Sequence, residues 1–330
     1  MAKRRLTVQQ HRRIAEKQRK TVLGLDSDGD VADGGIEGVV ITRFGTQAAV
    51  LPPDFRPGDR PQRCHIRAAL ADLVTGDRVI WRPGSPTGVV EARLDRASVI
   101  SRPDPRGKLR PVAANVDRIA VVIAPEPEPH PNLIDRYLVA AEHEGIRPLL
   151  ILNKVDLMGP GDSHIDRMLA DYRALGYDIL RVSAEAGIGL AEMRAYFARH
   201  TTVLVGQSGV GKSSLINLLY PEAQALIGEL SAQMAKGRHT TTAATLYRLP
   251  GGGQLVDSPG IREFGLGHLD SRAIAEGFIE FRPFLGTCRF RDCHHAQEPG
   301  CAILDAVARH AISARRFGSY QLMVRGGGEG

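Results

Sequence analysis

The sequence is poor in cysteine and lacks long apolar runs. Its 330 residues include four cysteines, too few for a chain of this size to be held together by a disulfide framework. No run of 18 apolar residues occurs, which excludes a membrane-spanning helix. The basic N-terminus also lacks the apolar segment of a secretory signal. With 43% hydrophobic residues, the composition is that of a globular protein, and the length of 330 residues allows two or three domains. We expect a cytoplasmic protein that does not bind membranes.

Positive charge is concentrated at the N-terminus. The net charge is +6, and residues 1–20 alone supply a surplus of seven, because eight basic residues there face a single acid, Glu16. The eight are Lys3, Arg4, Arg5, Arg12, Arg13, Lys17, Arg19 and Lys20. Such a run is either a solvated tail or an arm that neutralises nucleic-acid phosphates, and the tail alone does not decide between them.

Two regions precede the central part of the chain. Residues 1–35 form the basic tail and an Asp/Gly-rich linker, and residues 36–100 contain short expected strands separated by turn residues. The expected strands cover residues 38–43, 47–51, 63–69, 77–82 and 88–93. This pattern predicts a β-barrel of the OB type, although an SH3-like barrel would give much the same pattern.

The central region, residues 101–270, alternates strands with helices. We expect strands at 117–124, 147–152, 178–182 and 201–205, and helices at 131–144, 162–175 and 190–199. This rhythm predicts an α/β domain with a doubly wound, mostly parallel sheet. The last region, residues 271–330, is expected to be a small helical domain around a group of cysteines and histidines.

The segment GQSGVGKS lies between an apolar strand and an apolar helix, which is the context of a phosphate-binding P-loop. Gly206 and Gly211 let the backbone bend close to the phosphates, and N–H groups at the helix N-terminus point at phosphate oxygens. Lys212 would reach the β- and γ-phosphates, and the Ser213 hydroxyl would hold Mg²⁺. The predicted nucleotide-binding residues of this loop are Gly206, Gln207, Ser208, Gly209, Val210, Gly211, Lys212, Ser213 and Ser214.

A second phosphate-side motif, DSPG, follows a short apolar strand further along the chain. Asp257 would bind Mg²⁺ through water, and the Gly260 N–H would sense the γ-phosphate. Ras-like enzymes place a glutamine directly after this motif to orient water, but Ile261 occupies that position and cannot do so. We therefore predict slow intrinsic hydrolysis that a partner stimulates.

Between these two motifs lies the polar segment KGRHTTT, residues 236–242. A threonine here would cap Mg²⁺ and the γ-phosphate only in the triphosphate state, and we favour Thr241 over Thr240 and Thr242. His239 is the candidate within the chain for positioning the attacking water. The alternatives are a plain polar loop and a solvated histidine. The predicted catalytic residues are His239, Thr241 and Lys212, and the predicted magnesium ligands are Ser213, Thr241 and Asp257.

The motif NKVD directly follows an apolar strand and predicts a guanine site. Asp156 can accept hydrogen bonds from guanine N1–H and the 2-amino group, whereas adenine lacks both donors and would leave the carboxylate unpaired. Asn153 would brace the loop, and the stem of Lys154 would lie over the ring. Ser183 and Ala184, after the next strand, match the companion motif whose Ala N–H meets guanine O6.

These motifs occur in an unusual order. In Ras-like GTPases the P-loop comes first, whereas here NKVD and Ser-Ala precede the P-loop and DSPG comes last. The same sheet can form if the original termini are joined and the chain is opened elsewhere, so we predict a circularly permuted GTPase domain. The γ-phosphate-sensing segments, residues 230–265, then lead directly into the C-terminal region, and we hypothesise that a change of nucleotide moves that region.

Three of the four cysteines crowd into the segment CRFRDCHHAQEPGC. Three thiolates and one imidazole make a closed tetrahedral set that suits structural Zn²⁺. The predicted ligands are Cys288, Cys293, His295 and Cys301, with His294 as the alternative imidazole. Cys64 lies in an expected barrel strand and is interpreted as a small apolar side chain.

Together these motifs resemble those of the RsgA family, also called YjeQ or EngC, which are bacterial GTPases that depend on the small ribosomal subunit. The similarity rests on NKVD, GQSGVGKSSLIN, GRHTTT, DSPGIREFGL and the spacing C-x₄-C-x-H-x₅-C. The resemblance implies an OB barrel, a permuted GTPase domain and a C-terminal zinc domain. It also implies that the small (30S) subunit and its rRNA are partners in a late maturation step and stimulate GTP hydrolysis. We expect a monomer.

Three other functions fit parts of the sequence. One is a permuted GTPase that acts on the large subunit or another RNA, and a second is an ATPase or small-molecule kinase built on a P-loop, against which Asp156 argues. The third is a nucleic-acid-binding module that holds GTP as a structural ligand only. Substitution of Lys212 and Ser213 would leave the function of such a module intact.

Overall fold

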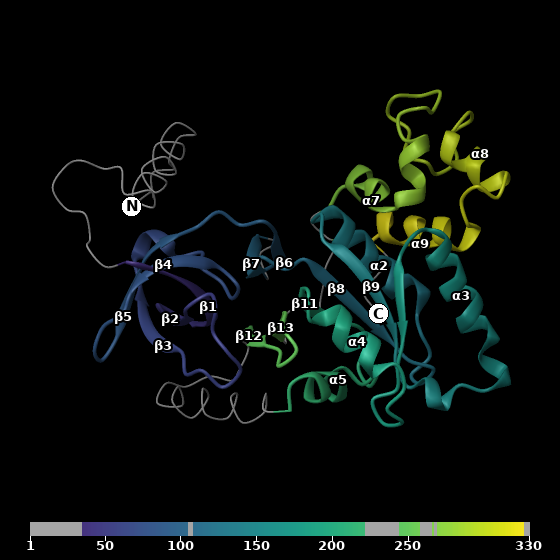
Figure 1. Cartoon of the computed structure of the whole chain (residues 1–330). Coiled ribbons are helices and arrows are strands. Elements are labelled where there is room, and N and C mark those ends of the chain that lie inside the picture. The colour runs from purple at the N-terminus through teal and green to yellow at the C-terminus, as the bar shows by residue number, and fades with distance from the viewer. Residues whose placement is uncertain (1–34, 105–107, 222–243, 258–265, 267–268, 327–330) are drawn as a thin grey trace.

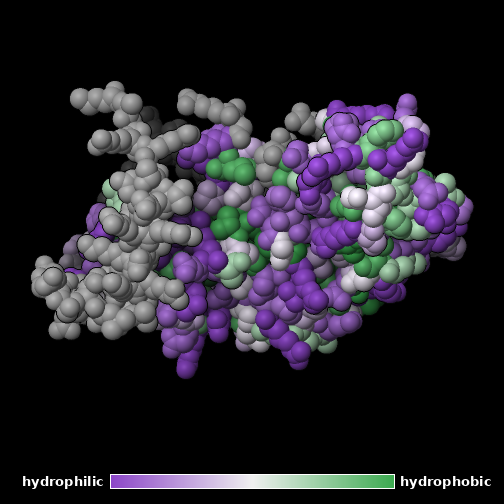
Figure 2. Space-filling model, turned by 90° about the horizontal axis from the view of Figure 1, so that it is seen from above, coloured by the Kyte–Doolittle hydropathy of each residue, from purple (hydrophilic) through white to green (hydrophobic). Residues whose placement is uncertain are grey.

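The computed structural model describes residues 35–104, 108–221, 244–257, 266 and 269–326 (Figure 1). Within these ranges no helix is both long and apolar enough to span a membrane. Seen from above, hydrophilic residues cover most of the described part of the surface, with smaller hydrophobic patches between them (Figure 2).

The N-terminal domain is a closed barrel of five strands. They are β1 (Ile36–Phe44), β2 (Gln47–Leu51), β3 (Gln62–Ile66), β4 (Arg78–Arg82) and β5 (Gly88–Arg93). The strands pair in the circular order β1-β2-β3-β5-β4-β1, and only the β3–β5 pair is parallel. This closed order is that of the OB fold, so the OB prediction is confirmed and the SH3-like alternative is excluded.

The barrel core forms because every second side chain of a strand points inward. Its members include Val40, Ala48, Val50, Cys64, Val79, Trp81 and Val90. Burial raises the pKa of the Cys64 thiol to about 11, so this cysteine is an apolar core side chain, as predicted. Strand β3 is shorter than expected, because the chain leaves the sheet after Ile66 and forms a 3₁₀ turn at Ala68–Leu70 that buries Leu70.

The central domain contains the predicted parallel sheet. Its parallel strands are β8 (Arg118–Ile123), β9 (Arg147–Leu152), β10 (Asp178–Arg181), β11 (Thr201–Val205) and β13 (Gln254–Asp257), in the order β10-β9-β8-β11-β13. A further strand, β12 (Thr245–Arg248), pairs antiparallel with β13. The alternation of strands and helices did not predict β12, because no helix separates β12 from β13.

Helices cover both faces of this sheet (Figure 1). Alternate residues of β8, such as Val121, pack with α2 (Pro131–His143) and α3 (Ser163–Ala174), whereas Val122 faces the side of α4 (Leu190–Phe197) and α5 (Lys212–Leu219). Helix α2 begins with a proline, whose fixed φ suits the first helical position, and the chain leaves it at Gly145 with φ 66°. The doubly wound prediction is therefore confirmed.

The barrel and the central sheet are joined into a single sheet of eleven strands, because β1 pairs with β12 at Thr42↔Thr245. Between them lies a hairpin, β6 (Val99–Pro103) and β7 (Leu109–Ala114), which the strand and helix patterns of the sequence do not predict. The predicted boundary after residue 100 falls within β6.

The C-terminal region consists of α7 (Ser271–Gly277), a 3₁₀ segment (Ile279–Phe284), α8 (Ala302–Ala308) and α9 (Ala314–Val324). It lies against α2, and a side chain at Gly277 would place Cβ 2.7 Å from Val139 Cγ1, so this close approach requires glycine. A cluster of aromatic rings, Phe278, Phe281, Phe317 and Tyr320, forms the core of the region.

A buried ionic network anchors this region to α2 and α3. The Arg316 guanidinium, 1% exposed, donates to Asp135 Oδ1 at 2.7 Å and to both Glu280 oxygens at 2.6 and 2.9 Å. Tyr172 donates to the same Asp135 oxygen at 2.5 Å, and Arg315 bonds the other Asp135 oxygen at 3.1 Å. Because the opposite charges are paired and hydrogen-bonded, the network is tolerated in the interior and fixes how the helices meet.

Candidate nucleotide site and metal centre

The nucleotide-site residues gather at one edge of the central sheet. Strands β8, β9, β11 and β13 are parallel, so the loops that leave their carboxyl ends begin at the same edge. In open α/β sheets this edge is where ligands bind. Gly206, Asn153 and Asp257 all lie at these strand ends.

The P-loop has a backbone that only glycine allows at two points. Gly206 has φ 134°, and a Cβ there would lie 2.2 Å from the Val122 carbonyl oxygen. Gly211 has φ 91°, and a Cβ there would lie 2.3 Å from Asn153 Nδ2. Helix α5 begins at Lys212, whose ammonium donates to the Gly206 carbonyl at 2.7 Å and to the Gln207 carbonyl. The loop therefore curls around a cation at a helix N-terminus, an arrangement suited to phosphate.

Asn153 links three loops of the site. Its side chain is 1% exposed, and its Nδ2 donates to the Val210 carbonyl in the P-loop at 2.9 Å. Its Oδ1 accepts the Ala184 N–H at 3.3 Å, and its own backbone N–H donates to Ile123 at the end of β8 at 2.8 Å. The bracing predicted for Asn153 is thus observed, and it extends to the P-loop and to the Ser-Ala loop. The Ala184 N–H, which was predicted to meet guanine O6, donates to Asn153 Oδ1 in this structure.

Two further residues of the NKVD motif, Lys154 and Asp156, are at least partly exposed at this edge. Lys154 adopts φ 60° and its ammonium donates to the Glu126 carbonyl at 2.8 Å. Asp156 is exposed on a short 3₁₀ turn (Val155–Leu157). Ser183 is buried and its hydroxyl accepts the Ala186 N–H at 2.9 Å. Lys154 and Asp156 are therefore accessible to a base that enters between these loops.

Of the predicted magnesium and catalytic residues, the structure describes Asp257, Lys212 and Ser213. Asp257 ends β13 and lies directly opposite Thr245 of β12. His239, the threonines at 240–242, Gly260 and Ile261 lie outside the described residues.

Sequence reasoning missed two contacts, one from the β8–α2 connection and one from helix α2 itself. Besides the Glu126 carbonyl on Lys154, Tyr137 of α2 is 3% exposed and hydrogen-bonds the backbone of Gly206. Burial raises the pKa of the Tyr137 hydroxyl, and the Gly206 hydrogen bond and the charge of Arg136 oppose that shift. A tyrosine in an amphipathic helix carries no sequence signal for such a contact.

The C-terminal cysteines and one histidine form a compact cluster. The ligand atoms of Cys288, Cys293, His295 and Cys301 all lie within 4.8 Å of one another. His295 Nδ1 is 3.5 Å from Cys288 Sγ and 3.4 Å from Cys301 Sγ, and the two sulfurs are 3.9 Å apart. Tetrahedral zinc with Zn–S bonds of about 2.3 Å and Zn–N bonds of about 2.0 Å implies about 3.8 Å between sulfurs and about 3.5 Å between sulfur and nitrogen.

These spacings fit a tetrahedral ion, so the cluster could hold a metal such as zinc. The alternative ligand, His294, is exposed and lies outside the cluster. Glu298 supports the ligand loop, because its carboxylate accepts the N–H groups of His294 at 2.9 Å and Ala296 at 2.8 Å. Such backbone hydrogen bonds, including one from its own N–H, lower the pKa of Glu298 to about 2.

The parallel sheet, the P-loop, the guanine-type motif and their order define a circularly permuted P-loop GTPase. The sequence model of the family described as RsgA GTPase matches residues 93–267. The chain belongs to the RsgA GTPase family, and it is an enzyme that hydrolyses GTP.

Relatives and solved structures agree with this assignment. The chain is 52% identical over 336 residues to the small ribosomal subunit biogenesis GTPase RsgA of Chromohalobacter salexigens, covering 99% of both chains. It is 52% identical over 334 residues to the protein of that name from Azotobacter vinelandii, covering 97% of both. The crystal structure of YjeQ from Thermotoga maritima matches with a TM-score of 0.72 and 28% identity, over 89% of this chain and 98% of that one. YloQ, a circularly permuted GTPase, matches with a TM-score of 0.70 and 26% identity, over 91% of this chain and 98% of that one.

Proposed function

We propose that this protein binds the small ribosomal subunit in the cytoplasm and hydrolyses GTP there during a late step of subunit maturation, as a monomer whose turnover the subunit stimulates. The observation that carries the proposal is the junction made by Asn153, which holds the NKVD, Ser-Ala and P-loop segments together at one sheet edge. That junction supports a guanine-nucleotide site, and the names of the relatives support the ribosomal partner.

Two groups of residues would bind the nucleotide. Asp156 accepts the two guanine donors, Lys154 covers the ring, and Asn153, Ser183 and Ala184 form the wall beside the base. Lys212 and the N–H groups of the P-loop neutralise the phosphates, and Ser213 with Asp257 would hold Mg²⁺, which neutralises charge at the β- and γ-phosphates when bound. The exposure of Asp156 and the position of Lys212 within its loop support these roles.

The bond-breaking step is assigned to residues that sequence alone suggests. Thr241 would sense the triphosphate, the Gly260 N–H would contact the γ-phosphate, and His239 or a group from the ribosome would orient water. Ile261 cannot do so, since an aliphatic side chain neither donates nor accepts a hydrogen bond. Because Ile261 occupies the water-orienting position, we expect slow turnover when no partner is bound.

Structural zinc is proposed for the Cys288, Cys293, His295 and Cys301 cluster. All four positions are filled by protein atoms, and such a closed set leaves no position for substrate. The sulfur and nitrogen donors support zinc rather than an oxygen-preferring ion, and their spacings are compatible with it.

The barrel offers a surface for RNA. On β3, Arg63 and His65 are exposed while Cys64 between them is buried, and exposed Arg67 follows the strand. This alternation places basic side chains together on the outward face, and the strand 2–3 face of OB barrels is the one that binds oligonucleotides. Phosphate neutralisation by such side chains supports rRNA as the partner.

Co-sedimentation distinguishes this proposal from a GTPase of the large subunit. The full chain, with a non-hydrolysable GTP analogue, is centrifuged through sucrose with purified small or large subunits. We expect it to travel with small subunits only. Equal or exclusive association with large subunits would remove the assigned partner and favour the alternative function.

A further inference from the structure

Backbone pairing between the barrel and the GTPase sheet is sparse, although apolar residues of both, such as Ile41 and Leu246, pack in one buried core. Strand β1 pairs with β12 at a single position, Thr42↔Thr245, whereas β12 pairs with β13 at four. Strand β13 ends at Asp257, so the successive strand pairs β1–β12 and β12–β13 connect the barrel to the proposed magnesium site. Backbone pairing along these strands is weakest between β1 and β12, so a further hydrogen bond at the start of β12 strengthens the coupling of the barrel to Asp257.

A second tie comes from the junction segment, residues 72–77, which precedes β4. The Thr75 hydroxyl donates to the Ala244 carbonyl at 2.7 Å, across 169 positions of sequence. Thr75 is 2% exposed and Ala244 7% exposed, so water does not replace the bond if the hydroxyl is removed. Ala244 directly precedes β12 and follows Thr241 by three positions in the sequence.

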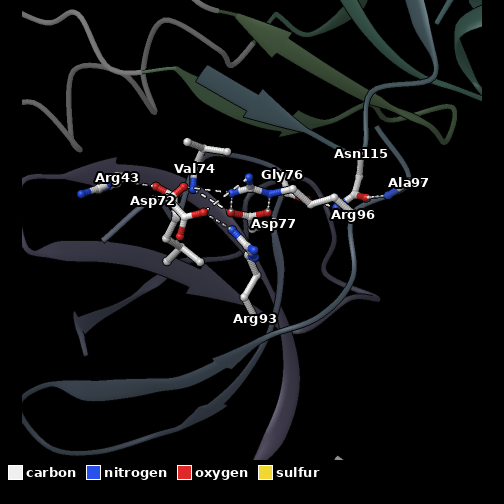
Figure 3. Close-up of polar contacts among 10 residues, drawn as sticks. Arg43, Asp72, Val74, Gly76, Asp77, Arg93, Arg96, Ala97 and Asn115 are labelled. Atoms are coloured by element: carbon white, nitrogen blue, oxygen red, sulfur yellow. Dashed lines mark hydrogen bonds and ion pairs between the residues drawn. The ribbon is translucent and has the colours of Figure 1, made fainter. Parts of the chain in front are cut away.

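The junction segment is itself held rigidly on the barrel (Figure 3). Arg96 bonds both oxygens of the fully buried Asp77 carboxylate, at 2.6 and 2.8 Å. Arg43 of β1 donates to the Leu73 carbonyl at 2.7 Å. A bidentate, buried Arg–carboxylate pair fixes geometry as well as charge, so Thr75 cannot move independently of the barrel.

The other side of the junction segment is pinned to the β6–β7 hairpin. Asn115 Nδ2 donates to the Gly76 carbonyl at 2.8 Å, and the Ala114 N–H donates to the Thr75 carbonyl at 2.9 Å. Gly76 has φ 85°, and a Cβ there would lie 2.2 Å from the Ala114 carbonyl oxygen. The segment is therefore held on two sides, and its Thr75 hydroxyl bonds Ala244, the residue directly before β12.

We propose that Thr75 is a positioning residue for the subunit-stimulated hydrolysis of GTP, acting by coupling the barrel to β12 rather than within the nucleotide site. Through Ala244 it fixes the start of β12 to the barrel, so that the barrel and the β12–β13 pair carrying Asp257 respond as one body when the ribosome engages the barrel. The inference rests on the proposed function, since it names the barrel as the side from which stimulation arrives. It places no part of the chemistry on Thr75 itself.

The test compares three full-length variants. Thr75→Val removes the hydroxyl at nearly constant volume, and Thr75→Ser restores it. Thr202→Val is the matched control, because Thr202 is also fully buried but its hydroxyl has no hydrogen-bond partner among the described residues. GTP hydrolysis is measured alone and with small subunits, alongside subunit co-sedimentation and amide hydrogen exchange of residues 244–248.

We expect Thr75→Val to keep intrinsic hydrolysis within about twofold and subunit binding unchanged, while the subunit-stimulated rate falls about fivefold or more, as loss of one buried hydrogen bond allows. Exchange at 244–248 should accelerate in Thr75→Val and not in Thr202→Val, and Thr75→Ser should behave as the parent. An unchanged stimulated rate with unchanged exchange overturns the inference, as does an equal loss of both rates. If the parent itself is not stimulated, the proposed partner fails, and exchange at 244–248 still decides whether Thr75 holds β12.

Discussion

Replacing Asn153 by alanine tests how the nucleotide site is assembled. The change orphans the buried Val210 carbonyl and the Ala184 N–H, which now lie 2.9 and 3.3 Å from the Asn153 side chain. Orphaned groups cost roughly 1–3 kcal/mol each, but the free variant can relax by letting its loops separate and admit water. GTP binding must then restore the arrangement, so we expect about 2–3 kcal/mol to appear as lost affinity, which is about 30–150-fold.

The assay is equilibrium binding of a fluorescent GTP analogue, with thermal unfolding measured on the same samples. Asn132→Ala is the matched control, since the Asn132 amide contacts Ser319 of α9 and is exposed. That variant should bind GTP as the parent does. An Asn153→Ala affinity within twofold of the parent would refute the reasoning, because the three loops would then hold their positions without the bridge.

Three further substitutions have defined outcomes. Asp156→Asn should weaken GTP binding about 100-fold, because two charge-assisted hydrogen bonds at roughly 1.5–3 kcal/mol each are damaged, while weak ATP binding stays unchanged in a competition assay. Cys301→Ser should lower bound zinc, measured by mass spectrometry, from about one ion per chain and should lower the melting temperature. Arg316→Met should reduce the free energy of unfolding in urea by about 3–5 kcal/mol, because Glu280 loses both of its Arg316 hydrogen bonds and Asp135 keeps only Arg315 and Tyr172. Arg272, which is exposed and forms an i,i+4 ion pair with Glu276, provides the control. Arg272→Met should alter the free energy of unfolding by about 0.5 kcal/mol or less.

Each of these three predictions has a result that would contradict it. Unchanged guanine preference in the Asp156 variant would remove the assigned base contact. A full zinc complement in the Cys301 variant would show that this thiol is not a ligand. Equal destabilisation of the Arg316 and Arg272 variants would show that burial does not set the strength of the ionic network.

Local patterns predicted the elements closely. Strands β2, β9 and β11 begin and end where the apolar runs and turn residues placed them, because each is a short apolar segment between clear breakers. The P-loop was recognisable because its glycines are needed by the backbone, as Gly206 and Gly211 demonstrate. The Cys/His cluster was also predicted from the sequence, with His295 preferred to His294.

Contacts between distant segments were beyond the sequence. The β6–β7 hairpin and β12 lack the strand–helix rhythm on which the central domain was predicted, and the Thr75–Ala244 bond joins residues 169 positions apart. Nor does any local pattern distinguish Tyr137, which contacts Gly206, from an ordinary core tyrosine of an amphipathic helix. Such contacts depend on how finished elements pack, which a period of 2.0 or 3.6 residues does not encode.

The most direct test of the account is steady-state GTP hydrolysis by the purified protein, alone and with small ribosomal subunits, with large subunits and ATP as controls. We predict slow turnover alone and a rise of at least about tenfold with small subunits, a threshold set below the roughly 10³–10⁵-fold that partner-completed GTPase sites reach. The increase in turnover should occur with GTP and not with ATP. No rise, or an equal rise with large subunits, would contradict the assignment of the small subunit as the partner that activates this enzyme.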